Sequence, residues 1–388
     1  MYAVASGAAP AHIHPVSPGE KLVMIVEPRF APVRQVFQDQ FAEGLELGAR
    51  FSLVIDDVTV LDLWGGQADR AGAAPFDDRT LAPVFSTTKA LAAILVARLV
   101  AEGRLSYRQT VASIWPEFAQ AGKGEITVEQ ALSHQGGLSG FRFAIDPALW
   151  FDWKGLCAEL AAMAPLWPPG TASGYHPITF GYIAGEIFRR IDGRTMGTAL
   201  REDLAVPLDL DLWIGLPDGE FPRVAQMERP KAVPSFGEVN IATRAAFLTR
   251  WASPGGRSGD EWRRAEIPSA NGHATALALA RLMGRLATTG EGVLDPAVRD
   301  EMARERICGQ DLVLPYVMSW GAGVMRNADS GAFGPGRLAF GHSGWGGSVA
   351  VCDPERRLGL AYVMNRQGTD LRGDPRARRL IDAVYGCL

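Results

Sequence analysis

The sequence has little cysteine and no large excess of either charge, and each of these features excludes a class of protein. Its four cysteines, Cys157, Cys308, Cys352 and Cys387, lie far apart and form no C-x-x-C pair. Neither a zinc knuckle nor a disulfide framework is therefore indicated. The 39 basic and 43 acidic residues give a formal net charge of -4. This balance, without long blocks of one sign, argues against a nucleic-acid partner.

Long hydrophobic runs are also absent. The densest apolar run, residues 90–97, is much shorter than the roughly 18 to 20 residues that a membrane-spanning helix needs. The residues before Lys21, which include His12 and His14, have neither the charged start nor the apolar centre of a secretion signal. We therefore expect a cytoplasmic protein with no membrane partner and a flexible tail over residues 1–22, in which the two histidines bind no metal.

The chain does contain enough apolar residues to build a large core. Of its 388 residues, 47% are apolar and 9% are aromatic, which excludes a disordered chain and a coiled coil. This length leaves room for two compact lobes or one large domain. Such a chain is expected to act on a small molecule or on a protein.

Hydrophobic patterning differs between the ends and the middle of the chain. Alternating apolar residues predict strands near both ends, at residues 51–55, 58–64, 337–340, 348–351 and 358–363. Helical periodicity, supported by a capping-box pattern at Thr127 and Gln130, predicts helices at residues 33–41, 90–102, 180–191, 276–286 and 376–385.

The simplest architecture that satisfies this pattern is an α/β (α+β) fold. A mainly antiparallel sheet is built from both termini and flanked by helices, and a helical domain is inserted between its halves. The predicted sheet domain covers residues 23–110 and 265–388, and the predicted helical domain covers residues 111–264. The cleft between them is the expected active site.

The most informative stretch places Ser86 three residues before Lys89, at the start of an apolar helix. Residues three apart share a helix face, so the amine can approach the hydroxyl. Partial burial and the positive end of the helix dipole both favour an uncharged amine, which can accept the Ser86 proton. The alternative is that Ser86 only caps the helix.

The scarcity of lysine favours proton transfer between Ser86 and Lys89 over a simple helix cap at Ser86. Only five of the 39 basic residues are lysines, namely Lys21, Lys89, Lys123, Lys154 and Lys231. Unlike arginine, lysine can lose its proton at working pH. Of the five, only Lys89 has a serine three residues before it.

Two further segments carry candidate residues. Tyr175 follows Pro169-Gly170 on a turn-rich loop before a helix. Its pKa is expected to fall beside a cationic amine, so that it shares the general-base work, unless it is simply a packing residue. Residues 341–348 read GHSGWGGS, and their small side chains allow a ligand to approach a backbone N–H. The alternative there is a β-bulge or tight turn.

Taken in order, Ser86-x-x-Lys89, Tyr175 and His342-Ser343-Gly344 resemble the three signatures of the serine β-lactamase and penicillin-binding-protein superfamily. Within it, the sequence is most similar to the family VIII carboxylesterases. The resemblance implies the class C β-lactamase fold. It also implies that Ser86 is the acylated nucleophile and that Lys89 and Tyr175 transfer protons.

The same resemblance implies that the backbone N–H groups of Ser86 and Trp345 form the oxyanion hole, with His342, Gly344 and Trp345 in contact with the substrate. The sequence departs from the β-lactamase signatures at two positions, and both bear on the class of substrate. The position two residues after the tyrosine, an Asn in β-lactamases, is Pro177, and the lysine of the third signature is His342. Both changes disfavour an anionic, amide-bearing substrate.

We therefore predict a serine carboxylesterase that hydrolyses small acyl esters without a metal or other cofactor. The alternatives are a β-lactamase, peptidase or acyltransferase on the same scaffold, and a binding module that retains the fold without catalysis. The physiological substrate, the acyl-chain length and the oligomeric state are not evident from the sequence.

Overall fold

The computed structural model describes residues 25–255, 259–327 and 330–388. The predicted tail, residues 1–22 with His12 and His14, lies outside these described residues. The helices are α1 (Ala31–Ala42), α2 (Thr88–Ala101), α3 (Val111–Ile114), α4 (Val128–Leu132), α5 (Trp153–Ala162), α6 (Thr179–Asp192), α7 (Met196–Leu200), α8 (Ile241–Thr243), α9 (Asp260–Arg264), α10 (Ala276–Ala287), α11 (Pro296–Ala303) and α12 (Pro375–Tyr385). The strands are β1 (Ile25–Val26), β2 (Gly48–Ile55), β3 (Val58–Gly66), β4 (Ala82–Phe85), β5 (Leu212–Ile214), β6 (Gly272–Ala274), β7 (Ile307–Gln310), β8 (Val317–Trp320), β9 (Met325–Arg326), β10 (Phe340–Ser343), β11 (Val349–Asp353) and β12 (Leu358–Met364).

Strands from both ends of the chain form one antiparallel sheet, as predicted. Within the described residues, nine strands lie in the order β1-β3-β2-β12-β11-β10-β9-β8-β7. Each neighbouring pair is antiparallel. The pairing of β2 with β12, in which Leu53 lies opposite Leu360, joins the two ends of the chain. The sheet is therefore complete only when residues far apart in sequence have come together.

The hairpin between β2 and β3 turns at Asp56 and Asp57. Both residues have positive φ angles, of 49° and 67°, as a two-residue hairpin loop of the favoured kind requires. Asp tolerates this region better than most residues. The predicted strands at residues 51–55 and 58–64 are confirmed, and the ladder continues at the far end of the hairpin to the pair Gly48 and Gly66.

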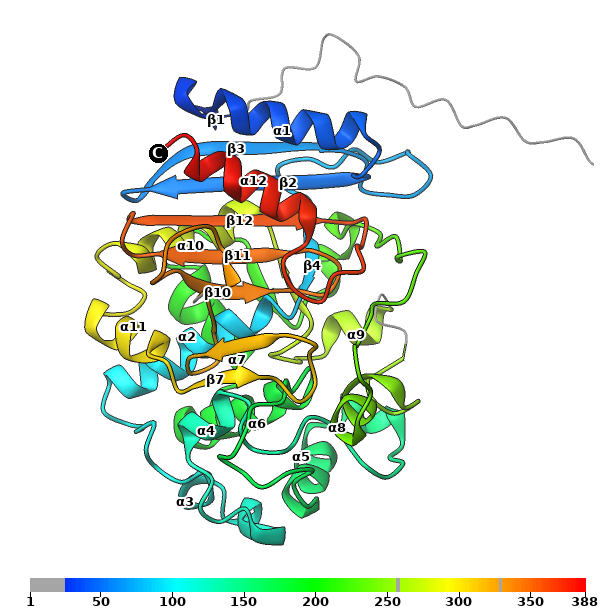
Figure 1. Cartoon of the computed structure of the whole chain (residues 1–388), viewed down its shortest axis with the longest axis vertical. Coiled ribbons are helices and arrows are strands. Elements are labelled where there is room, and N and C mark those ends of the chain that lie inside the picture. The colour runs from blue at the N-terminus through cyan, green and yellow to red at the C-terminus, as the bar shows by residue number, and fades with distance from the viewer. Residues whose placement is uncertain (1–24, 256–258, 328–329) are drawn as a thin grey trace, which may run out of the picture.

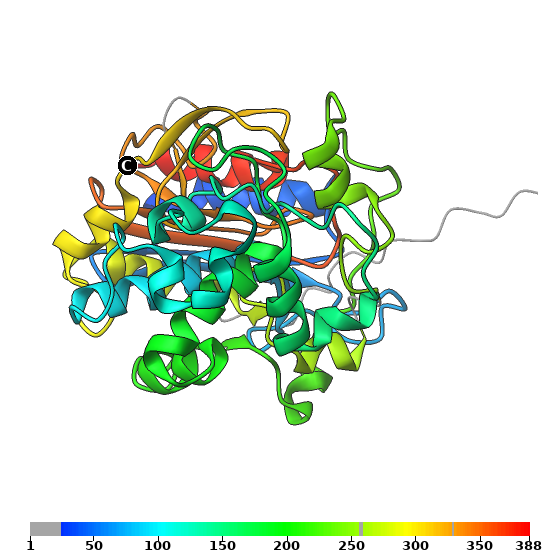
Figure 2. The same cartoon turned by 90° about the horizontal axis from the view of Figure 1, so that it is seen from below.

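Helices cover both faces of the sheet (Figure 1). α1 and α12 lie side by side on one face (Figure 2), and α10 packs against the other, behind the sheet in Figure 1. The approach of α10 to β12 is close enough to require glycine, because a Cβ at Gly359 would lie 2.0 Å from the backbone nitrogen of Gly284. This layering of helices on a mainly antiparallel sheet confirms the predicted fold class.

The helices predicted from periodicity are present. α1, α6, α10 and α12 match their predicted ranges closely, and the capping box at Thr127 and Gln130 is formed with both of its hydrogen bonds. α2 begins earlier than predicted, at Thr88, and 11 of its 14 residues are buried. A helix that is apolar around its whole circumference belongs in the interior. Lys89, in its first turn, is therefore buried as well.

A second, three-stranded sheet with the order β4-β6-β5 is not predicted from the sequence. Its strands have only three or four residues, which is too short for alternation to be recognised. β4 ends at Phe85. This small sheet therefore holds the chain directly before Ser86.

One predicted strand is misplaced. Residues 337–340 lie outside the sheet except for the last of them, because β10 runs from Phe340 to Ser343. The residues after Phe340 have low strand propensity, yet pairing with β9 on one side and β11 on the other keeps β10 extended. The strands predicted at residues 348–351 and 358–363 are confirmed as β11 and β12.

None of the helices in the described ranges is long and apolar enough to cross a bilayer. The cytoplasmic location stays a prediction. The division into a sheet domain and a helical domain at residues 110/111 and 264/265 also stays a prediction, although α3 to α9 all lie between these limits.

Candidate active site

Ser86 lies in a sharp turn between β4 and α2. Phe85, the last residue of β4, has a φ angle of +46°, a conformation that is costly for a bulky residue and is enriched at functional sites. The backbone N–H of Lys89 donates to the Ser86 carbonyl oxygen at 3.0 Å. Ser86 thus precedes the helix instead of sharing its face, and the turn brings the two side chains together.

Lys89 is fully buried, and its Nζ has three oxygen neighbours. It lies 3.1 Å from Ser86 Oγ, 2.7 Å from the Pro177 carbonyl oxygen and 2.9 Å from the Ser269 carbonyl oxygen. Burial holds the pKa of Lys89 well below its usual range. An uncharged amine has two N–H groups, and carbonyl oxygens can only accept them. The lone pair is then left for the Ser86 hydroxyl.

Tyr175 completes this cluster from the loop before α6. The Lys89 Nζ lies 4.8 Å from the centre of the Tyr175 ring, and the ring stacks on Trp320 with centroids 5.7 Å apart. Burial raises the pKa of Tyr175, and this effect exceeds that of its hydrogen bond with Ser86. The expected fall in the Tyr175 pKa is therefore wrong, because burial of the phenol disfavours its charged form.

A buried carboxylate holds the Tyr175 loop in place. Asp311 Oδ1 accepts hydrogen bonds from the backbone N–H groups of Tyr175, Val313 and Leu314 at 2.9, 2.9 and 3.0 Å. Its Oδ2 accepts from the Ser173 hydroxyl at 3.0 Å. All four groups donate to the same buried carboxylate. The position of the phenol therefore depends on a residue 136 positions further along the chain.

The third segment packs against the turn that carries Ser86. The Thr87 hydroxyl lies 3.1 Å from Ser348 Oγ, and Ser348 donates to the Val84 carbonyl oxygen at 2.8 Å. A Cβ at Gly344 would lie 2.2 Å from that same Val84 oxygen. Only glycine permits this approach, which brings the backbone before Trp345 next to the strand leading into Ser86.

His342 is buried in the same cluster and is uncharged. Its Nδ1 lies 2.7 Å from the Ser343 carbonyl oxygen, so Nδ1 carries the proton. Its Nε2 has no hydrogen-bond partner among the described residues. Burial lowers the pKa of His342 to about 3. The side chain therefore brings no positive charge to the cluster.

The sequence does not predict three groups that orient the side chains of the site. The Pro177 and Ser269 carbonyl oxygens orient Lys89, and Asp311 orients Tyr175. A backbone carbonyl has no signature in a sequence. Asp311 is one of many acidic residues, and its burial at 4% exposure together with its hydrogen bond with Tyr175 becomes evident only in the fold.

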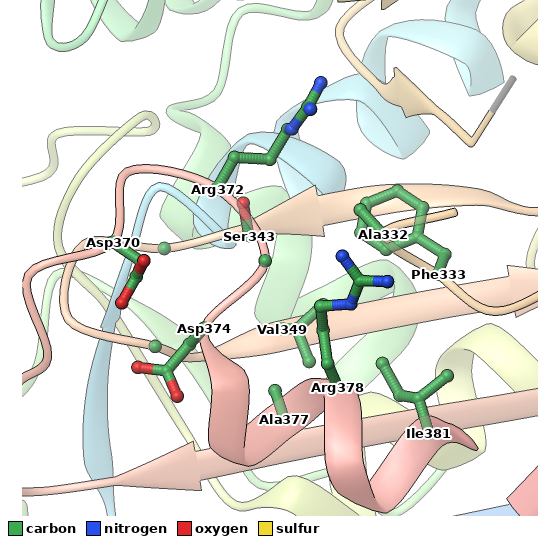
Figure 3. Close-up of a pocket in the computed structure, with 13 residues that line it drawn as sticks. Ala332, Phe333, Ser343, Val349, Asp370, Arg372, Asp374, Ala377, Arg378 and Ile381 are labelled. Carbon is green, nitrogen blue, oxygen red and sulfur yellow. The ribbon is translucent and has the colours of Figure 1, made fainter. Parts of the chain in front are cut away.

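A small cavity lies between β10, β11 and the start of α12 (Figure 3), and it shares Gly344 with the segment that packs against the Ser86 turn. It has room for about 10 Å³, which is about one water molecule. Ser86, Lys89 and Tyr175 do not line it. Its walls are formed by Ala332, Phe333, Ser343, Gly344, Gly347, Val349, Asp370, Arg372, Gly373, Asp374, Ala377, Arg378 and Ile381.

Comparison with known proteins identifies the family. The model of the beta-lactamase family matches residues 33–384. The esterase/beta-lactamase LipL of Mycobacterium tuberculosis is 34% identical over 368 residues, which span 90% of this chain and 84% of LipL.

Two solved structures are similar over nearly the whole fold. A penicillin-binding protein homologue from Caulobacter crescentus is 62% identical with a TM-score of 0.92, covering 94% of this chain and 99% of that protein. A family VIII carboxylesterase is 41% identical with a TM-score of 0.88 over the same shares of the two chains. These matches confirm the resemblance inferred from the three signatures. The chain belongs to the beta-lactamase family of serine hydrolases.

Proposed function

We propose that the chain is a serine carboxylesterase that hydrolyses small acyl esters through an acyl-enzyme on Ser86. The observation that carries the proposal is the 3.1 Å separation between the buried Lys89 Nζ and Ser86 Oγ. Two carbonyl oxygens engage the amine from other directions. This arrangement supports Lys89 as the group that removes the Ser86 proton during attack on the ester carbonyl.

Tyr175 is proposed as the proton donor to the leaving group. Its raised pKa keeps the phenol protonated at neutral pH. Collapse of the tetrahedral intermediate breaks the ester C–O bond, the phenol proton passes to the leaving alkoxide, and Lys89 returns the Ser86 proton to the phenolate. Water then attacks the acyl group by the same route, with the proton flow reversed at each step, and releases the acid.

The backbone N–H groups of Ser86 and Trp345 are proposed to bind the oxyanion. Support comes from the contact of Gly344 with the strand before Ser86. Removal of one such donor costs roughly 3 to 4 kcal/mol in other serine hydrolases. The proposed substrate contacts at His342, Gly344 and Trp345 follow from the same placement.

The surroundings of the cluster favour an uncharged ester. His342 carries no positive charge with which to bind a carboxylate. The Pro177 carbonyl oxygen already accepts a hydrogen bond from Lys89. Trp345 lies 6.3 Å from Phe247, which in turn lies 4.9 Å from Phe236 (centroid distances). These rings provide an apolar wall for an acyl chain or an alcohol group. A cytoplasmic location remains part of the proposal.

The second candidate is hydrolysis of an amide bond, and the name of LipL, esterase/beta-lactamase, keeps it open. The test compares kcat/KM for p-nitrophenyl butyrate and nitrocefin under one set of conditions. We expect the ester to be preferred by at least about 100-fold, or about 2.7 kcal/mol in transition-state binding. An equal or reversed preference would assign the chain to amide chemistry. Failure of a fluorophosphonate to label Ser86 would favour a non-catalytic binding module.

Replacing Asp311 with Asn tests the position of the Tyr175 phenol. The amide retains one acceptor oxygen but turns two N–H groups toward donors, so the loop shifts. We expect ester kcat to fall by about 10- to 100-fold with little change in KM, since misplacement by about 1 Å has this effect. Loss of the negative charge also lowers the pKa of Tyr175, which moves the alkaline limit of activity to lower pH.

A matched control separates positioning from folding. Asp353 is also a fully buried carboxylate that accepts backbone N–H bonds, from Glu355 and Arg356. Asp353→Asn is expected to lower the melting temperature similarly while kcat stays within about threefold of wild type. If both variants lost the same activity, Asp311 would have no special role in placing Tyr175.

A further inference from the structure

A second cavity lies among α5, α6 and the start of α7, and the proposed mechanism makes no use of it. Its volume is about 210 Å³, larger than the roughly 150 Å³ that holds a benzene molecule in an engineered protein cavity. None of Ser86, Lys89 and Tyr175 lines it. Its walls are formed by Trp150, Phe151, Trp153, Tyr182, Gly185, Arg189, Thr195, Met196, Ala265 and Glu266.

The aromatic side chains form a connected wall. The Tyr182 ring lies 5.7 Å from Trp150 and 5.0 Å from Trp153, measured between ring centroids. Their polar atoms are already bonded: Trp150 Nε1 donates to the Trp251 carbonyl oxygen at 3.0 Å, and Trp153 Nε1 donates to Glu186 at 2.8 Å. The Tyr182 hydroxyl donates to the Trp150 carbonyl oxygen. These residues therefore offer the cavity ring surface and no free donor.

The two charged residues of the wall differ in their partners. The Arg189 guanidinium forms two hydrogen bonds with Glu186, at 3.0 and 2.9 Å, so its charge is compensated. Glu266 has no ion-pair partner within the described part of the chain. Its Oε1 accepts only the Thr195 hydroxyl and its Oε2 only the Gly197 N–H, both at 2.8 Å.

Two glycines allow the Glu266 side chain to lie directly against the backbone. A Cβ at Gly197 or at Gly215 would lie 2.7 Å from a carbon atom of that side chain. Burial raises the pKa of the carboxyl, and this effect exceeds that of the hydrogen bonds from Gly197 and Thr195. The Thr195 hydroxyl and the Gly197 N–H account for one hydrogen bond to each oxygen, but a carboxylate has about four acceptor positions. The remaining ones are available to a ligand.

We propose that this cavity is a binding site for a small organic cation, separate from the proposed ester site. An alkylammonium group of the ligand lies against the aromatic faces and beside the Glu266 carboxylate, and an apolar body fills the rest of the volume. Aromatic rings attract cations through their negative faces, and the attraction is strongest where water is excluded. The uncompensated carboxylate supplies the matching charge. This binding needs no ester turnover.

The test compares choline with 3,3-dimethylbutan-1-ol, its uncharged carbon analogue, by isothermal titration calorimetry at low salt. We expect choline to bind with a Kd of about 1 mM or lower and at least about tenfold more tightly than the analogue. Glu266→Gln, whose amide oxygen can still accept from the Gly197 N–H while its NH2 group donates to the Thr195 hydroxyl oxygen, is expected to remove this preference. Equal binding of the two compounds, or no binding of choline at 20-fold excess over that Kd (about 20 mM), would overturn the proposal.

Two further measurements fix the location of the site. Ala265→Leu places additional carbon atoms in the cavity without changing any charge, and it is expected to abolish binding of choline while the melting temperature stays near that of wild type. Protein that is phosphonylated on Ser86 is expected to bind choline as tightly as unmodified protein. Retained binding in Ala265→Leu, or loss of binding after phosphonylation, would place the cation elsewhere and overturn the assignment.

Discussion

Replacing Ser86 with Ala is expected to reduce hydrolysis of p-nitrophenyl butyrate by at least about 1,000-fold in kcat. The variant lacks the oxygen that forms the acyl-enzyme, so only the oxyanion hole and substrate binding remain to accelerate the reaction. Initial rates at saturating ester measure the effect directly. Ser113→Ala, which removes an exposed hydroxyl bonded to the Thr110 carbonyl oxygen, is the control and should retain wild-type rates.

A retained rate in this variant would contradict the role of Ser86. If Ser86→Ala kept a rate within about tenfold of wild type, a different residue would carry the acyl group. Melting temperature must be measured alongside, because Ser86 is only partly buried and its loss should change stability by no more than about 0.5 kcal/mol.

Replacing Lys89 with Met is expected to have the second large effect, a fall of at least about 1,000-fold in kcat/KM. Met has nearly the same length but has no lone pair for the Ser86 proton. In wild type the free amine is the active form. The rate should therefore rise with pH through the Lys89 pKa, which burial holds well below its usual range, and then reach a plateau. The plateau persists because burial raises the pKa of Tyr175. Measurement of kcat/KM across pH tests both points.

Lys123 provides an unusually close control. It is also fully buried, and its Nζ donates to the carbonyl oxygens of Gln120, Ala161 and Met163 at 2.7, 2.9 and 2.5 Å. Burial lowers the pKa of Lys123 to about 8. Lys123→Met removes comparable hydrogen bonds away from the serine, so it should lower stability but leave kcat/KM of the folded protein within about threefold of wild type. Equal losses of activity in both variants would mean that burial, not proton transfer, explains the effect at Lys89.

Much of the fold follows from local patterning. Amphipathic periodicity located α1, α6, α10 and α12, since each of these helices buries one face against the sheet or against another helix. The two predicted strands at residues 51–55 and 58–64 are separated by only Asp56 and Asp57, and aspartate tolerates the positive φ that this turn requires. By contrast, the pairing of β4 with β6 joins short segments that lie far apart in the chain. Such contacts leave no periodic signal.

In the candidate site, too, local spacing predicts some residues, whereas others come from distant parts of the chain. Ser86 and Lys89 were recognised because a single turn places both of them, so spacing in the sequence translates directly into distance. The groups that orient them come from far away: Ser269 is 180 residues from Lys89, and Asp311 is 136 residues from Tyr175. The direction of the Tyr175 pKa shift also depended on burial, which is a property of the assembled fold and not of neighbouring residues.

The central claim is that an uncharged Lys89 turns Ser86 into the nucleophile. Intact-mass spectrometry after rapid quenching of wild type with a slowly hydrolysed ester tests it most directly, with peptide mapping to locate the adduct. We predict one acyl group per chain on Ser86, accumulating faster as pH rises, and no adduct in Ser86→Ala or Lys89→Met. An acyl group on any other residue, or rapid acylation of Ser86 in the Lys89→Met variant, would contradict the mechanism.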